Sequence, residues 1–281
     1  MTITSLGTLT APLVCVLIVC GCSVCGCSSQ GGVTNQDDAV PGSEISAKIR
    51  SLDLAARESV IYHELTSGHT PSWMDDFQPV SVTRTVNGVE HTVTFSAAVD
   101  YFTVGTDDDP FLVPLSPQMA QRVADHYNAS LPTRRMVDDI WNAADVKLAP
   151  QPIPPSDAMT TVPVFVEHNN TVQEQKKDRG VNVTQIVAGQ KKDVVLSNRL
   201  TTQAGKVAIY GWHQLNGNAI QPLYTGHTDQ WVDYSHGIRL VGNVVTIDGV
   251  AYDLVDVLTD AALAPLLSDE GAMTFTRYPT E

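Results

Sequence analysis

The stretch PVSVTRTVNGVEHTVTFSAAVDYFTVG, residues 79–105, alternates β-branched and polar side chains on both sides of Asn87-Gly88. A period of two places alternate side chains on opposite faces of a strand, and Asn-Gly is the dipeptide that two-residue hairpin turns favour. The stretch therefore predicts two antiparallel strands joined at Asn87-Gly88, with a third strand near residues 97–104.

Helical patterns lie on both sides of this predicted hairpin. Residues 44–68 space their apolar side chains at intervals close to helical, and they end at Gly68, a residue type that commonly terminates helices. Ser116 and Thr133 are residue types that cap helix N-termini, and each precedes a stretch with an apolar stripe. We expect the two short helices after these caps to cover the sheet.

Strand patterns dominate after residue 160. The predicted strands are residues 162–168, 192–197, 206–213, 231–242 and 243–255, followed by a helix at 257–267. Strands and helices do not alternate regularly, which favours an α+β fold with a mixed or mostly antiparallel sheet and a few covering helices. Residues 44–281 are predicted to form a single domain, and the four prolines in 147–159 mark a loop that is a candidate sub-boundary.

The composition restricts the class of partner. Apolar residues make up 43% of the 281 residues, enough for a substantial core, and the formal net charge is −14. Phosphate backbones repel such a chain, and its few lysines and arginines form no long basic stripe, so nucleic acid is excluded as a predicted partner.

All five cysteines lie within the first 27 residues. Residues 11–20 are an uncharged apolar run of the length typical of a signal-peptide core, so residues 1–27 are predicted to be a signal peptide, although residues 1–10 contain no Lys or Arg. VCGC at 19–22 and again at 24–27 resembles the bacterial lipobox, which implies lipidation of Cys22 or Cys27. Residues 28–43, rich in Ser, Gly and Asp, are predicted to be a flexible tether. We therefore expect a bacterial protein that is exported and is either a cell-envelope lipoprotein or secreted.

Residues with acid–base side chains gather between positions 206 and 242: His213, His227, Asp229, Asp233, His236 and Arg239. Imidazole and carboxylate groups are what general acid–base catalysis requires, and histidine also coordinates metals. We predict His213 and His236 as acid–base residues or ligands, Asp233 as the group that orients a histidine or binds a metal, and Arg239 as the contact for an anionic substrate group. His213 and His227 are candidate ligands for a divalent metal such as zinc.

A structural interpretation of the same residues stays open. In a single strand over 231–241, His236 faces the apolar side, where a core histidine bonded to a main-chain carbonyl is common. Asp233 and Arg239 would then be a simple surface pair. The aromatic residues Trp212, Tyr224, Trp231 and Tyr234 are expected around the cluster, either as core or as contacts for a saccharide.

Residues 235–240, SHGIRL, resemble the S-H-G-C-I-R-L signature of the bacterial L,D-transpeptidases, with the cysteine missing. Residues 209–213, IYGWH, are similar to the strand that supplies an upstream histidine in that family, where these segments form the site that attacks a peptidoglycan stem peptide. The cysteine is the nucleophile of the family, and no thiol follows Cys27 here. The resemblance therefore implies either a chance match or a relic that has lost its nucleophile, and it excludes a cysteine transpeptidase.

These observations predict a secreted or lipid-anchored hydrolase that acts on an extracellular or cell-envelope polymer through the C-terminal His/Asp cluster. The expected partners are that polymer or a small-molecule substrate, with membrane contact only through the N-terminal lipid. The alternative is a non-catalytic envelope lipoprotein that binds a glycan or a protein partner, including the cysteine-less relic described above.

Overall fold

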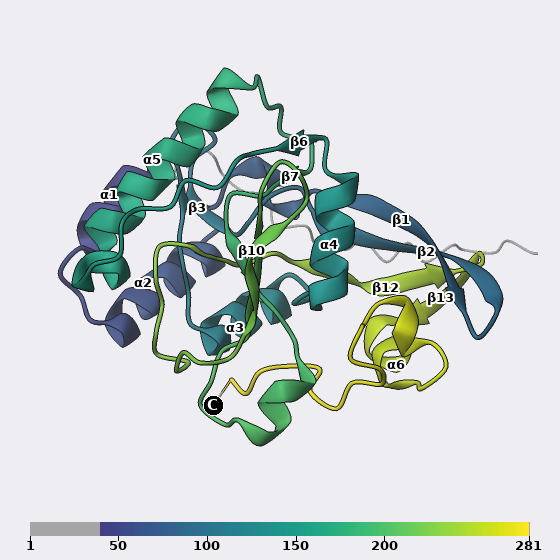
Figure 1. Cartoon of the computed structure of the whole chain (residues 1–281). Helices are drawn as coiled ribbons and strands as arrows, with labels where there is room; N and C mark the ends of the chain where they lie inside the picture. The colour runs from purple at the N-terminus through teal and green to yellow at the C-terminus, as the bar shows by residue number, and fades with distance from the viewer. Residues whose placement is uncertain (1–39, 281) are drawn as a thin grey trace, which may run out of the picture. The chain divides into compact units, whose positions relative to one another are not determined.

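A computed structural model describes residues 40–280 of the chain (Figure 1). The predicted signal peptide, the lipidation candidates Cys22 and Cys27 and most of the predicted tether lie outside the described residues. The described residues all belong to one compact unit, Thr34–Glu281. Among residues 40–280, no helix has the length and apolar character needed to cross a membrane.

The fold is α+β with mostly antiparallel sheets. The α-helices are α1 (Gly42–Ile49), α2 (Leu54–Thr66), α3 (Pro117–His126), α4 (Arg134–Ala143), α5 (Val162–Asp178) and α6 (Leu254–Thr259). The strands are β1 (Phe77–Val86), β2 (Val89–Ala98), β3 (Thr103–Gly105), β4 (Pro110–Leu112), β5 (Ala129–Ser130), β6 (Val146–Lys147), β7 (Val187–Ala188), β8 (Lys192–Val194), β9 (Ile209–His213), β10 (Ala219–Tyr224), β11 (His236–Gly237), β12 (Val241–Ile247) and β13 (Val250–Asp253).

The predicted hairpin at Asn87-Gly88 is confirmed. β1 and β2 pair antiparallel from Phe77 opposite Ala98 to Val86 opposite Val89, and Asn87 and Gly88 both have positive φ, 52° and 81°. β12 pairs antiparallel with β2, while β13 and the short β5 pair with β12, which completes the first sheet. In Figure 1 the β1–β2 hairpin and the β12–β13 hairpin extend toward the same side of the molecule.

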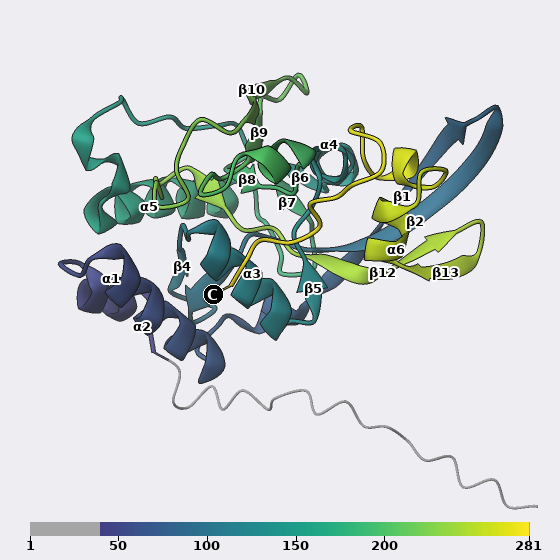
Figure 2. The same cartoon turned by 90° about the horizontal axis from the view of Figure 1, so that it is seen from below.

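The second sheet has the order β10-β9-β8-β11 and carries two of the predicted site residues, His213 on β9 and His236 on β11. β8 pairs antiparallel with β9 and parallel with β11, so that His236 lies opposite Lys192 and Gly237 opposite Asp193. Figure 2 shows α4 beside β9 and α5 along the same side of the fold as this sheet. Between Trp231 and Ser235 the chain is a loop, so the single strand predicted over 231–242 is wrong.

The strand predicted at 162–168 is also wrong, because these residues begin α5. The buried positions of α5 include Val162, Phe165, Asn169, Val172 and Lys176, a spacing of three or four residues that fits one face of a helix. The run of valines at its start suggested a strand, but β propensity is easily overridden when a helical stripe can be buried.

Helix ends follow local chemistry. The hydroxyls of Ser116 and Thr133 accept hydrogen bonds from the backbone N–H groups of Met119 and Met136, each at 3.2 Å, so both predicted N-caps are confirmed. The helix predicted over 44–68 is instead divided into α1 and α2, because the Asp53 carboxylate accepts from Ala56 N at 2.8 Å and starts a new helix.

Candidate functional site

Four of the residues predicted as one cluster lie in two separate environments, His213 with Arg239 and Asp233 with His236. The first, which we call the His213 site, comprises His213, Asp138, Asp193, Tyr101 and Arg239. The second, the Asp233 cluster, comprises Asp233, Ser235, His236 and Trp231.

The backbone of β9 explains how the His213 site forms. Tyr210 and His213 are three positions apart, so in a regular strand their side chains would point to opposite faces. Between them Gly211 and Trp212 have φ values of 105° and 56°, which reverses this alternation. Both side chains consequently reach the carboxylate of Asp138 on α4. A positive φ is unusual for a residue as large as tryptophan, and such local strain is concentrated at functional sites.

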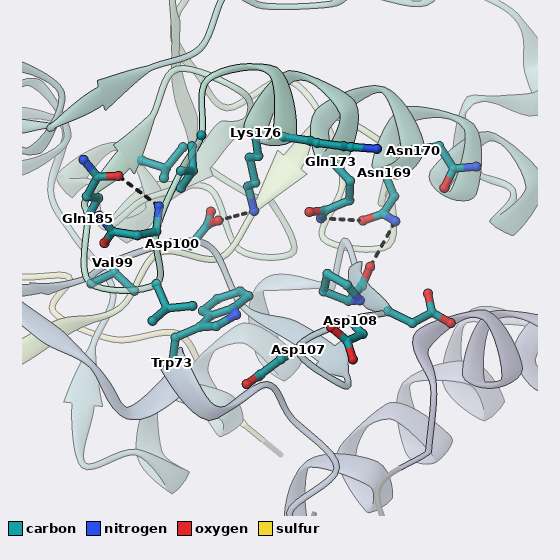
Figure 3. A pocket seen from close by; sticks show the side chains of 18 residues that line it. Trp73, Val99, Asp100, Asp107, Asp108, Asn169, Asn170, Gln173, Lys176 and Gln185 are labelled. Atoms are coloured by element: carbon teal, nitrogen blue, oxygen red, sulfur yellow. Dashed lines mark hydrogen bonds and ion pairs between the residues drawn. The ribbon is translucent and has the colours of Figure 1, made fainter.

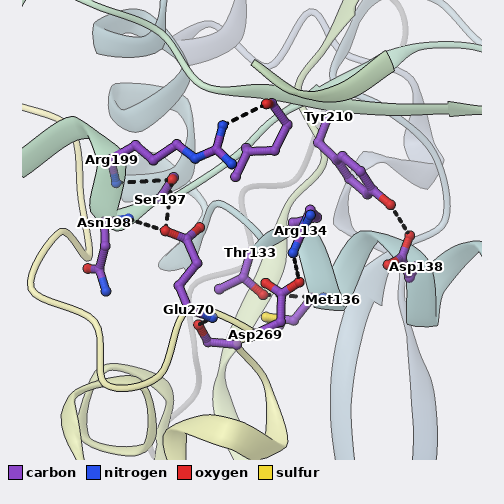
Figure 4. Close-up of polar contacts among 12 residues, drawn as sticks. Thr133, Arg134, Met136, Asp138, Ser197, Asn198, Arg199, Tyr210, Asp269 and Glu270 are labelled. Carbon is purple, nitrogen blue, oxygen red and sulfur yellow. Dashed lines mark hydrogen bonds and ion pairs between the residues drawn. The ribbon is translucent and has the colours of Figure 1, made fainter. Parts of the chain in front are cut away.

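Asp138 fixes the orientation of the His213 ring. Its Oδ1 lies 2.9 Å from His213 Nε2 and accepts from the Tyr210 hydroxyl at 2.7 Å (Figure 4 shows the Tyr210 contact). The His213 ring also stacks on Trp141, with 5.5 Å between centroids and 26° between planes. Since an ionised carboxylate only accepts hydrogen bonds, Nε2 carries the proton in neutral His213 and Nδ1 is the basic nitrogen. Within residues 40–280, Nδ1 has no hydrogen-bond partner.

A small hollow of about 10 Å³ adjoins this histidine. This volume is at the lower limit for holding one water molecule. Gly211 lies close to three of the lining residues, because a Cβ built on it would be 3.3 Å from Val137 Cγ1, 3.4 Å from Asp193 Oδ2 and 3.5 Å from His213 Cε1. The hollow is lined by Tyr101, Val137, Ile140, Trp141, Ala188, Gly189, Asp193, His213 and Arg239.

Asp193 is a buried carboxyl group beside the hollow. It accepts a hydrogen bond from the Tyr101 hydroxyl at 2.9 Å. Burial raises the pKa of Asp193 to about 6, although the charge of Arg239, the Tyr101 hydrogen bond and His213 act in the opposite direction. A carboxyl group that titrates near neutral pH can donate or accept a proton under physiological conditions.

Arg239 is buried under the site, with 1% of its surface exposed. Its Nη1 donates to the carbonyl of Ala98 at 2.9 Å and its Nη2 to the carbonyl of Val187 at 2.6 Å, while the guanidinium lies 4.1 Å from the centre of the Tyr101 ring. Arg239 therefore joins two chain segments and partly balances the charge of Asp193.

Replacing Asp193 with asparagine is expected to change how stability depends on pH. Asp193 has a higher pKa in the folded protein than its ordinary 3.8, so between pH 3.8 and about 6 the folded state binds more protons than the unfolded state. The wild type consequently loses up to about 3 kcal/mol as pH rises through this window, at about 1.4 kcal/mol per pKa unit, and the asparagine variant has no such loss. Urea unfolding at both ends of the window should show the variant gaining relative stability with pH. If the difference in unfolding free energy between the variant and the wild type did not change with pH, the electrostatic description of Asp193 would be contradicted.

The Asp233 cluster differs because its carboxylate already accepts three hydrogen bonds. Asp233 accepts from Ser235 N at 2.8 Å, from the Ser235 hydroxyl, and from Trp231 Nε1 at 3.2 Å. Burial acts to raise the pKa of Asp233, but His236, Lys192 and the bonds from Ser235 together hold it below its ordinary value. Because the Ser235 hydroxyl donates to Asp233, Ser235 and His236 do not form a serine–histidine pair.

The imidazole of His236 lies in the interior and forms no hydrogen bond to residues 40–280. Its Nε2 is 3.7 Å from Asp233 Oδ2, beyond hydrogen-bond range, and its Nδ1 has no partner within residues 40–280. Burial lowers the pKa of His236 to about 4, so the ring is neutral at physiological pH.

His227, the other candidate metal ligand, is in a different environment from His213. Its ring stacks on Trp231, with 5.1 Å between centroids and 12° between planes, and meets Tyr224 edge to face. Over the part of the chain that the structure describes, no three His, Cys, Asp or Glu side chains converge as a metal-binding group.

Asp138, Asp193 and Tyr101 were not among the residues predicted from the sequence. Asp138 comes from the amphipathic helix after Thr133, where Val137 and Trp141 also contribute to the hollow. The only sequence signal for Asp193 is a charged residue that begins an apolar strand, and this pattern is common. Comparison of the chain with protein-family models, with curated proteins and with solved structures found no match.

Proposed function

We propose that this protein is a hydrolase of the bacterial cell envelope that uses His213, oriented by Asp138, as its general base. The main support for this proposal is the 2.9 Å contact between His213 Nε2 and Asp138 Oδ1. His213 and Asp193 both line the hollow next to this contact. Holding a histidine in one tautomer by a carboxylate is the arrangement through which many hydrolases activate a nucleophile. The envelope location rests on the signal-like and lipobox-like residues 11–27.

The exposure of the carboxylate partner distinguishes His213 from His236 as the base, since the two histidine side chains are both buried, with 4% and 1% exposed. The Asp138 side chain is 42% exposed, and Trp141 and Tyr210 beside it are half-buried, so a substrate can approach this side of the sheet. Arg134 lies next to this surface, with its guanidinium 5.7 Å from the centre of the Tyr210 ring. It also forms an ion pair with Asp269 (Figure 4). By contrast, Asp233, the carboxylate beside His236, has only 2% of its side chain exposed.

The proton transfers follow from the two titratable groups. Nδ1 of His213 takes a proton from a water molecule as its oxygen bonds to the electrophilic carbon of the polymer linkage. The protonated form of Asp193, which is populated near its pKa of about 6, donates a proton to the leaving group as the old bond breaks. His213 then passes its proton to Asp193, directly or through solvent, which restores both groups.

Replacing Asp138 with asparagine is expected to reduce hydrolysis by about 100-fold or more while the fold is retained. The amide can donate to His213 as well as accept, so the tautomer with a basic Nδ1 is no longer imposed. Release of soluble fragments from purified cell-wall polymer, followed by mass spectrometry, measures the effect. Asp125→Asn is a matched control, since the Asp125 side chain is also 42% exposed and forms its ion pair with Arg277 at the surface. Equal losses in the two variants, or full activity in Asp138→Asn, would contradict the proposal.

A further inference from the structure

A cavity of about 610 Å³ lies apart from the hollow (Figure 3). It is lined by α5, by Trp73, by the loop around Asp108 and by residues 180–187. Its size falls within the range of small-molecule sites, about 300–1,000 Å³. Asp100 and Val187 line the cavity, whereas the next residues, Tyr101 and Ala188, line the hollow. The two spaces therefore lie on opposite sides of the same two chain segments.

Buried polar groups hold the base of this cavity rigid. Lys176 is 8% exposed and forms an ion pair with Asp100, whose Oδ1 also accepts from Tyr101 N at 2.7 Å and from Gln190 Nε2 at 2.9 Å. The charges of Lys176 and Asp100 cancel locally, so the base presents a neutral, fixed polar surface. Preorganised polar groups of this kind cost little entropy when a ligand binds.

Asn169 and Gln173 on α5 continue the network of fixed polar groups from the base of the cavity toward its opening. Asn169 Oδ1 accepts from Leu112 N at 2.9 Å and from Gln173 Nε2 at 3.3 Å, while its Nδ2 donates to the carbonyl of Pro110 at 3.1 Å. Gln173 Oε1 has no partner within residues 40–280, so its carbonyl can accept from a ligand. Figure 3 shows both amides on the cavity side of α5, above Asp108.

The remaining lining residues define the chemistry of the ligand. Asn170, Asn182 and Gln185 add amide groups, although Asn182 Oδ1 already accepts from Thr184 and Gln185 Oε1 from Asn182 N. Trp73 adds an apolar surface that is 8% exposed, with Lys176 Nζ 5.5 Å from the centre of its ring. Four aspartates and two lysines line the cavity, Asp100, Asp107, Asp108, Asp109, Lys176 and Lys177, which gives a net charge of −2. Negative charge disfavours anions, and alternating donors and acceptors match hydroxyl groups, which also do both.

We propose that this cavity binds an uncharged saccharide, with a sugar ring against Trp73 and its hydroxyls on Gln173, Asn170 and Asp108. Aromatic rings offer an apolar face to the C–H side of a sugar, and amides and carboxylates bind its hydroxyls. Asp108 has no hydrogen-bond or ion-pair partner between residues 40 and 280, so both of its oxygens are available as acceptors. The inference does not depend on catalysis at His213, because none of these residues lines the hollow.

Calorimetric titration of the full protein with three neutral oligosaccharides, cellotetraose, maltotetraose and chitotetraose, tests the proposal. We expect at least one to bind the wild type, and Gln173→Ala to weaken it by about fivefold to tenfold, the value of one hydrogen bond. Glu174→Ala is the control, since Glu174 is the exposed next residue of α5 and does not line the cavity. His213→Gln should bind as the wild type does, so failure of the hydrolase proposal would leave this result unchanged.

Three outcomes would overturn the saccharide site. They are no binding of any of the three oligosaccharides to folded wild type, equal affinity in Gln173→Ala and Glu174→Ala, or tighter binding of a polyamine such as spermidine than of every oligosaccharide. Trp73 also packs in the main core, so Trp73→Ala carries a risk of unfolding. For this reason Gln173, which is half-buried at the surface of α5, is the preferred position for the test.

Discussion

Replacing Arg239 with methionine is expected to destabilise the protein by about 3–5 kcal/mol, the usual effect of removing one partner from a buried charged arrangement. Methionine fills a similar volume but leaves the carbonyls of Ala98 and Val187 without donors. It also removes the charge that opposes the high pKa of Asp193, so the Asp193 carboxylate becomes harder to ionise. Urea unfolding followed by circular dichroism measures the change.

The loss of stability in Arg239→Met should depend on pH. Below about pH 6 Asp193 is protonated and needs no counter-charge, so Arg239→Met should be less harmful there than at pH 8. Arg239→Lys is the matched control, because it retains the positive charge but not both hydrogen bonds. A stability change in Arg239→Met within about 0.5 kcal/mol of wild type, the usual range of surface substitutions, would show that Arg239 does not hold the site together.

Replacing His213 with glutamine is expected to lower the rate of polymer hydrolysis by about 100-fold to 10,000-fold, the usual contribution of a general base. Glutamine keeps a side chain that can donate to Asp138, so the local packing and the contact with Trp141 are largely preserved. The initial rate of fragment release, compared with the melting temperature of the same preparation, measures the effect. Loss of rate with an unchanged melting temperature supports a catalytic role.

His236→Gln is the control for this variant. His236 is equally buried but lies in the Asp233 cluster and does not line the hollow. We therefore expect His236→Gln to keep its rate per folded molecule even if its melting temperature changes. A rate loss confined to His236→Gln would move the catalytic site to the Asp233 cluster.

Elements specified by neighbouring residues could be predicted from the sequence. The hairpin at Asn87-Gly88 and the N-caps at Ser116 and Thr133 depend on local backbone chemistry, and the structure confirms all three. The start of α5 could not be predicted, because its valines have strand propensity and the helix is stabilised by the burial of residues far along the same face, such as Val172 and Lys176.

The candidate site could be predicted only in part. The sequence indicated His213 and Arg239, but their partners Asp138 and Asp193 come from elements far away in the chain. The positive φ values at Gly211 and Trp212, which turn Tyr210 and His213 toward the same carboxylate, have no signature in a single sequence beyond one glycine. The sequence also predicted His236 and His213 in one cluster, whereas in the sheet β8 lies between the strands that carry them.

The most direct test of the central claim is hydrolysis of cell-wall polymer in water enriched in ¹⁸O, with the fragments analysed by mass spectrometry. We expect wild type and Asp125→Asn to release fragments that each carry one ¹⁸O at the new end, and His213→Gln and Asp138→Asn to release almost none. Absence of labelled fragments from wild type, or equal labelling by His213→Gln, would contradict the assignment of His213 as the base of a hydrolase.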